Sequence, residues 1–201
     1  MSQNPTGARP PVRKATLVVS LVCALPMIAV SVRGVMGELS ANPIEDVTHV
    51  TGEFALRWLI VTLAITPIRR ITGWAAIAPW RRTFGLAAFA YTVLHLLTWL
   101  VLDQGLDGTA IAEDLVERPY IWLGMAGFVT MVPLAATSTR ASMRRLGKRW
   151  VLLHRLTYLA AVLGVAHWWW LVKADERGPM VHAIVIAVLL GLRFVPARKP
   201  A

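Results

Sequence analysis

The fold is decided first by residues 151–172, which read VLLHRLTYLAAVLGVAHWWWLV. This run is long enough to cross a bilayer as a helix, which takes about 20 mostly apolar residues. It is one of six apolar stretches along the chain, which are Leu17–Val32, Glu53–Ile68, Phe84–Leu102, Pro119–Thr137, Val151–Val172 and Met180–Val195. The sequence therefore predicts an all-α, polytopic membrane helix bundle with six transmembrane helices.

Composition leaves room for one membrane domain and little else. The chain has 201 residues, of which 56% are hydrophobic, and its connecting loops are short. We expect a tail at 1–14, a transmembrane domain at 15–196 and a second tail at 197–201. We expect the first apolar stretch to be a retained helix, because it lacks a clear signal-peptide cleavage site. The single cysteine, Cys23, excludes an intrachain disulfide and a cysteine-based metal site.

The charges alternate along the chain. The net charge is +10, which by itself suggests a nucleic-acid partner, but the basic residues do not form one patch. They cluster before residue 15 and in 69–82, 140–149 and 193–199, whereas all eleven acids fall in the intervening loops. Because basic loops stay in the cytoplasm, both termini are predicted to be cytoplasmic and the acidic loops to lie outside. Membrane lipid is the expected environment, and nucleic acid is not an expected partner.

Three histidines lie inside the apolar stretches, where ionisable residues are costly and mark candidate functional sites. Along their helices, His95 lies ~16 Å, His167 ~24 Å and His154 ~4–5 Å from the inner end. Imidazole nitrogen suits haem iron, so we predict that His95 and His167 are the axial ligands of one haem in the outer half. His154 then binds a second, inner haem or serves the donor side. The alternative for any one of them is a packing or hydrogen-bonding histidine.

Other residues have two possible roles each. Arg155 pairs with a haem propionate or extends to lipid headgroups. His49 belongs to a quinone site or haem edge, or is a surface loop residue. His182 is expected at the interface, and Trp168–Trp170 in an aromatic belt.

Several short motifs, in this order and spacing, resemble the MsrQ family of haem-binding membrane subunits of the bacterial periplasmic methionine sulfoxide reductase system, which have a ferric-reductase-like transmembrane domain. The resemblance covers nearly the whole chain. The motifs are Asn42-Pro43, His49-Val50-Thr51-Gly52, Ile65-Thr66-Pro67, Arg82-Thr83-Phe84-Gly85-Leu86, Leu94-His95-Leu96, Arg118-Pro119-Tyr120, Thr137-Ser138-Thr139, Leu146-Gly147-Lys148-Arg149-Trp150, Leu153-His154 and His167.

The resemblance implies a location in the bacterial inner membrane and haem b linked to His95, His154 and His167. It implies electrons from the quinone pool or a cytosolic flavin reductase, passed to a periplasmic molybdopterin-containing methionine sulfoxide reductase. It also implies FMN, for which no residue is assigned. One haem is expected and a second stays open, because the position 13 residues before His95 is Arg82, where the larger oxidases of this fold have a second histidine.

Three alternatives remain at this stage. The protein is a ferric or other metal reductase of the same fold, a transporter whose histidines relay protons, or a structural membrane subunit without a cofactor. No internal repeat of 20–50 residues is evident, which argues against a transporter. An absorption spectrum of the purified protein separates the redox readings from the other two.

Overall fold

The computed structural model describes residues 11–172 and 175–193, with side chains from residue 15 onward. Within this part every regular element is helical, which confirms the all-α prediction; both expected tails lie wholly or largely outside it. The elements are α1 (Pro11–Val35), α2 (Pro43–Thr72), η1 (Ala75–Ile77), α3 (Trp80–Leu97), η2 (Thr98–Asp103), α4 (Gly108–Glu117), α5 (Tyr120–Ala136), α6 (Arg140–Leu146), α7 (Lys148–Leu153), α8 (Leu156–Leu171) and α9 (Arg177–Gly191).

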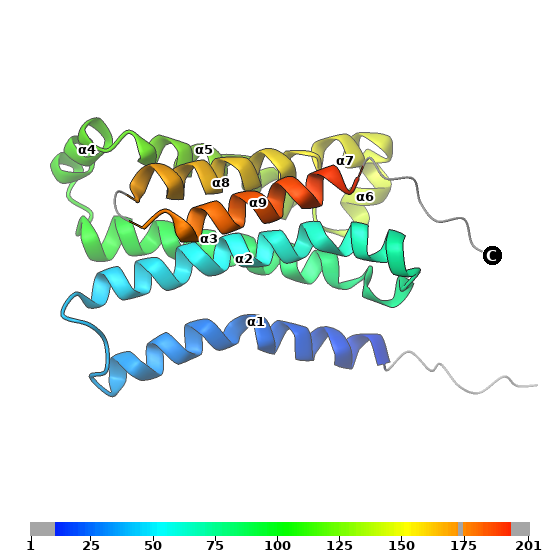
Figure 1. Ribbon diagram of the computed structural model, residues 1–201, viewed down its shortest axis with the longest axis horizontal. Coiled ribbons are helices and arrows are strands. Elements are labelled where there is room, and N and C mark those ends of the chain that lie inside the picture. Colours follow the sequence, from blue (N-terminus) through cyan, green and yellow to red (C-terminus); the bar gives the residue numbers. More distant parts are fainter. Residues whose placement is uncertain (1–10, 173–174, 194–201) are drawn as a thin grey trace, which may run out of the picture.

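The long helices lie roughly along one common axis. Figure 1 shows α1, α2, α3, α5, α8 and α9 lengthwise in the bundle, with α4 at one end and α6 and α7 at the other. The first turn of α1 and the last turn of α9 lie at the same end as α6 and α7. The acids lie in segments 38–53, 103–117 and 175–176, toward the α4 end of the bundle.

Within the described residues, three helical stretches are long and apolar enough to cross a membrane: Ala15–Val35, Ala75–Asp103 and Lys148–Leu171. A fourth is counted if Gly108–Glu117 and Tyr120–Ala136, which meet at 107°, form one span. The outward face of α1 carries exposed Leu17, Leu21, Leu25 and Ile28, which suits lipid rather than water. The described part of this membrane protein is thus all-helical with three or four clear spans, and six spans remain a prediction.

The structure contains one helix interruption and several short loop helices that the sequence did not predict. The stretch expected as one helix at 151–172 is broken between α7 and α8, at His154 and Arg155. The loops also contain short helices with polar caps: the Asp107 side chain accepts from the Thr109 N–H at 2.8 Å and begins α4, and Thr139 accepts from Ser142 N–H at 3.0 Å and begins α6.

Helix α1 is fastened to α3 at a proline. Pro26 has no N–H and disturbs the regular helical bonding of α1. The hydroxyl of buried Tyr91 lies at this point, accepting from the Met27 N–H at 3.1 Å and donating to the Cys23 carbonyl at 2.9 Å. One side chain of α3 therefore bridges a donor and an acceptor that an undisturbed helix would pair directly.

Candidate haem site

Two of the predicted histidines lie together. His95 from α3 and His167 from α8 have ring centroids 6.1 Å apart and ring planes at 82°. Metal–imidazole nitrogen bonds are about 2.0–2.1 Å long, so two nitrogens on opposite sides of one metal ion are separated by roughly 4 Å. A centroid separation of 6.1 Å fits such a gap, since each centroid lies behind its coordinating nitrogen.

Backbone carbonyls determine which nitrogen of each imidazole ring has a lone pair free to bind a metal. His95 Nδ1 lies 3.1 Å from the carbonyl oxygen of Thr48, and His167 Nδ1 lies 2.7 Å from that of Tyr120. Because a carbonyl oxygen can only accept, Nδ1 carries the proton and donates it, which leaves the lone pair on Nε2. A metal-bound histidine characteristically donates its other N–H to a backbone carbonyl in this way. Both side chains are thus oriented as ligands.

Glycines let the neighbouring helices approach these rings. A Cβ on Gly52 of α2 would lie 3.0 Å from His95 Cε1, and a Cβ on Gly124 of α5 would lie 3.0 Å from His167 Cε1. Both distances are shorter than ordinary van der Waals contact, so any larger residue would displace the ring. Glycine is needed here for close approach rather than for an unusual backbone angle.

The two histidines are held by matching constructions. In each half, the histidine follows its carbonyl partner by 47 residues, and the glycine lies four residues after that carbonyl, at 52 after 48 and at 124 after 120. The pairs α2–α3 and α5–α8 each supply one of the two histidines. The two constructions are offset by 72 residues, from 48 to 120 and from 95 to 167, so a search for repeats of 20–50 residues does not reveal them.

A cavity of about 860 Å³ opens between these helices, within the range of about 300–1,000 Å³ typical of ligand sites. Its inner wall is apolar, and its outer rim carries ionisable side chains. The inner wall includes Leu56, Leu59, Phe128, Met131 and Ala160; the rim includes His49, Glu53, Asp103, Arg118 and Asp175. An apolar slot with two opposed imidazoles fits a haem.

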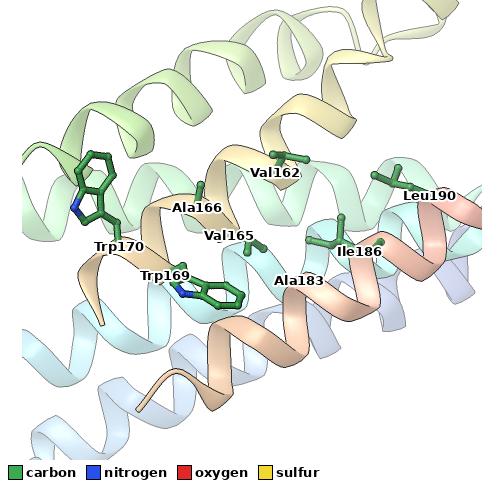
Figure 2. Close-up of a pocket in the computed structure, with 9 residues that line it drawn as sticks. Val162, Val165, Ala166, Trp169, Trp170, Ala183, Ile186 and Leu190 are labelled. Carbon is green, nitrogen blue, oxygen red and sulfur yellow. The ribbon is translucent and has the colours of Figure 1, made fainter. Parts of the chain in front are cut away.

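A second hollow lies on the other side of α8 and is different in kind. Figure 2 shows it between α8 and α9, lined by Val162, Val165 and Ala166 from one helix and Ala183 and Ile186 from the other. Its volume is about 610 Å³, and aliphatic and tryptophan side chains line it without any histidine. Its described lining offers no histidine to a metal, unlike the lining of the first cavity.

His154 is separate from the pair. It lies at the end of α7, stacked on Trp150 with ring centroids 3.8 Å apart, and does not line the cavity. Its Nδ1 is 3.1 Å from the Trp150 carbonyl, while its buried Nε2 has no hydrogen-bond partner among the described residues. Arg155, next to it, is exposed and also lies outside the cavity lining.

The remaining histidines are placed near the outer end. His49 is exposed at the cavity mouth, with Nε2 3.8 Å from Glu45 Oε1. His182 packs edge-on against Trp168 at 5.0 Å, with Nδ1 2.8 Å from the Gly178 carbonyl. Among the residues described, no group of three or more His, Cys, Asp or Glu side chains could hold a bare metal ion.

Sequence reasoning missed the groups around the histidines. It quoted Gly52 and the segment Arg118–Tyr120 as motif residues, without placing any of them at the site, and it assigned no role at the site to Gly124. The available signal was the position of His49-Val50-Thr51-Gly52 and Arg118-Pro119-Tyr120 at the outer ends of two apolar stretches. These segments begin the helices that contact His95 and His167.

Comparison with known proteins supports this picture. Residues 51–165 match the family described as ferric reductase like transmembrane component. The chain is 48% identical to the protein-methionine-sulfoxide reductase heme-binding subunit MsrQ of Rhodospirillum rubrum, over 92% of this chain and 89% of the relative. It is 44% identical to the protein of that name from Caulobacter vibrioides, over 100% and 98%.

A third relative of that name, from Ralstonia nicotianae, is 46% identical over 90% of this chain and 85% of its own. No solved structure matches the chain. The family match covers more than half of the chain, and the identities extend over nearly all of it. The chain therefore belongs to the MsrQ family of ferric reductase like transmembrane proteins.

Proposed function

We propose that this protein is a haem b-containing electron-transfer subunit that delivers electrons across the inner membrane to a periplasmic, molybdopterin-containing methionine sulfoxide reductase. The observation that carries the proposal is the facing pair His95 and His167, each with Nδ1 bonded to a backbone carbonyl. The printed names of the relatives, heme-binding subunits of a protein-methionine-sulfoxide reductase, agree with it.

The haem supplies one-electron chemistry when bound, and the chain's own residues prepare its site. The Thr48 and Tyr120 carbonyls hold the imidazoles in one tautomer and orientation, which raises their basicity as ligands. The apolar inner wall excludes water and lowers the local dielectric, which tunes the reduction potential.

The proposed topology has six spans with both chain ends in the cytoplasm. It is supported by α2 and α9 running alongside the clear spans and by the acids gathering toward one end. Electrons enter from the quinone pool or a cytosolic flavin reductase at the end carrying α6 and α7, and leave at the acidic end. FMN remains part of the proposal from family resemblance alone.

His154 is proposed to serve a second, inner haem or the donor side. Its buried, unpartnered Nε2 supports a further group at that position, and Arg155 is then placed to meet a propionate of that group. Because His154 lies apart from the cavity, its role is separable from that of the pair.

The test is the absorption and electron paramagnetic resonance spectra of the purified protein. We expect a Soret band that sharpens on dithionite reduction, with the low-spin signal lost in His95→Ala and in His167→Ala. His154→Ala should keep that signal and slow electron entry from the donor. Absence of haem from the wild-type protein, or loss of the low-spin signal in His154→Ala with its retention in His167→Ala, contradicts the proposal.

Orientation is tested independently with reporter fusions. Alkaline phosphatase inserted at Asp107 should be active, and the same reporter at the C-terminus should be inactive. The reverse pattern would overturn the topology without affecting the haem assignment.

A further inference from the structure

The cavity that holds the histidine pair changes character with depth. Its inner wall consists of aliphatic, aromatic and methionine side chains, whereas Glu45, Glu53, Asp103 and Asp175 line the outer rim. A haem has an apolar body and propionate carboxylates along one edge. Ionised carboxylates are strongly disfavoured against the apolar inner wall, where they would lose their hydration, so the propionate edge must face the rim.

The rim carboxylates would repel the haem propionates at short range unless a cation lies between or beside them. Arg118 is the only lysine or arginine among the described residues that line the cavity. Its guanidinium is permanently charged and matches a carboxylate in a planar, two-pronged geometry. Among the described lining residues, Arg118 therefore provides the fixed positive charge that can offset the propionates there.

The Arg118 guanidinium is also held in place from behind. Its Nε lies 3.2 Å from Asp114 Oδ1, and its Nη1 lies 3.4 Å from Asp114 Oδ2. Asp114 is 8% exposed and accepts two further hydrogen bonds, from Trp99 Nε1 at 2.9 Å and from Gln104 Nε2 at 3.0 Å. The carboxylate is thus fixed by several partners, and Arg118 retains N–H donors for a second carboxylate.

Chain connectivity links this charge to the iron ligand. Arg118 stands two residues before Tyr120, whose carbonyl holds His167 Nδ1 at 2.7 Å. One short segment at the start of α5 therefore orients an axial imidazole and places a guanidinium at the mouth of the same cavity.

We propose that Arg118 binds a haem propionate at the outer mouth of the cavity, with Asp114 as its positioning residue. This inference rests on the proposed haem function and goes beyond it by assigning the anchor for the carboxylate edge.

The experiment compares haem with haem dimethyl ester, which lacks the propionate charges. Apoprotein is titrated with each compound in detergent, and affinity is read from the Soret band. Arg118→Ala should bind haem roughly 10- to 100-fold more weakly than wild type, as expected for loss of a charge-assisted hydrogen bond. With the dimethyl ester, the variant and wild type should bind equally.

Arg33→Ala is the control. Arg33 is also an exposed arginine, near the outer end of α1, with Nη2 3.0 Å from the Glu38 carbonyl oxygen. Neither Arg33 nor Glu38 lines the cavity, so the removal of Arg33 should leave both affinities unchanged. Arg118→Lys keeps the charge without the planar geometry, should fall between wild type and Arg118→Ala, and serves if the alanine variant does not fold.

An equal loss for haem and for its ester in both Arg118 variants would mean that Arg118 acts only through the Asp114 network, and the inference would be wrong. Unchanged haem affinity in both variants would overturn it as well. Failure of wild-type protein to bind either compound would instead refute the proposed function, so the two failures are distinguishable.

Discussion

Gly124→Ala is expected to weaken haem binding by crowding His167, a proposed axial ligand. The new methyl group would lie 3.0 Å from both Cε1 and Nδ1 of His167, where ordinary contact begins at 3.4 Å. The ring cannot yield freely, because its Nδ1–H is bonded to the Tyr120 carbonyl at 2.7 Å. The substitution must therefore move α5 away from α8 or turn the imidazole away from its ligand orientation.

The magnitude follows from these two possibilities. Overpacking a well-packed position costs about 1–3 kcal/mol, and loss of the carbonyl hydrogen bond costs about 1 kcal/mol. If the whole cost of about 1–3 kcal/mol reduces the free energy of haem binding, the affinity for haem falls roughly 5- to 150-fold. We expect a loss within that range, with a broadened low-spin signal as the imidazole takes more than one orientation.

Gly85→Ala on α3 is the control. Its Cβ would meet Thr62 Cγ2 at 3.6 Å, which is ordinary contact, and Gly85 does not line the cavity, so haem binding should be close to wild type. Soret titration of apoprotein and electron paramagnetic resonance of the ferric protein provide the readouts. Wild-type affinity in Gly124→Ala, or an equal loss in Gly85→Ala, would refute the idea that glycine is required for the ring's position.

Three further predictions concern other parts of the molecule. Tyr91→Phe removes the bridge at Pro26 and should lower the free energy of unfolding by about 0.5–1.5 kcal/mol, measured by thermal unfolding in detergent, with the haem spectrum unchanged. Asp107→Asn with Glu113→Gln should slow electron transfer to the periplasmic partner at low salt and have little effect at high salt; an unchanged rate at low salt would remove these acids from docking. The backbone N–H of Ser40 donates to the Asp46 carboxylate and lowers the pKa of Asp46 below its ordinary value. The stability that this hydrogen bond contributes should therefore be fully present above about pH 4 and be lost as the pH falls through that lowered pKa. A carboxyl resonance of Asp46 that titrates at the ordinary value would contradict this.

Hydrophobicity and charge were enough to predict a helical membrane bundle and the nearness of two of its histidines. Residues counted along two helices running the same way placed His95 and His167 at similar depths, and the structure brings them together. The identification of the family from short motifs is also confirmed. Their role as haem ligands stays a prediction.

Features that depend on contacts between helices could not be predicted from the sequence. The role of Gly124 was not predicted, because nothing in one sequence shows that its missing side chain makes room for His167. The break at His154 and Arg155 was hidden by an unbroken apolar run. The sequence placed Asp114 only among the acids of the outer loops, whereas the structure buries its carboxylate against Trp99 and Gln104.

The matching His-bearing hairpins have a consequence for how the cell handles this subunit. Helix α2 packs against α3 and α5 against α8, and the proposed iron site needs one imidazole from each pair. Ligation would therefore join the two halves of the chain, and a ligand that binds only the folded state shifts the balance away from open forms. When haem is scarce the halves should lose this link, and we expect the newly made chain to be degraded faster by membrane proteases. We therefore expect the cellular abundance of the subunit to follow haem supply even when its transcription is constant.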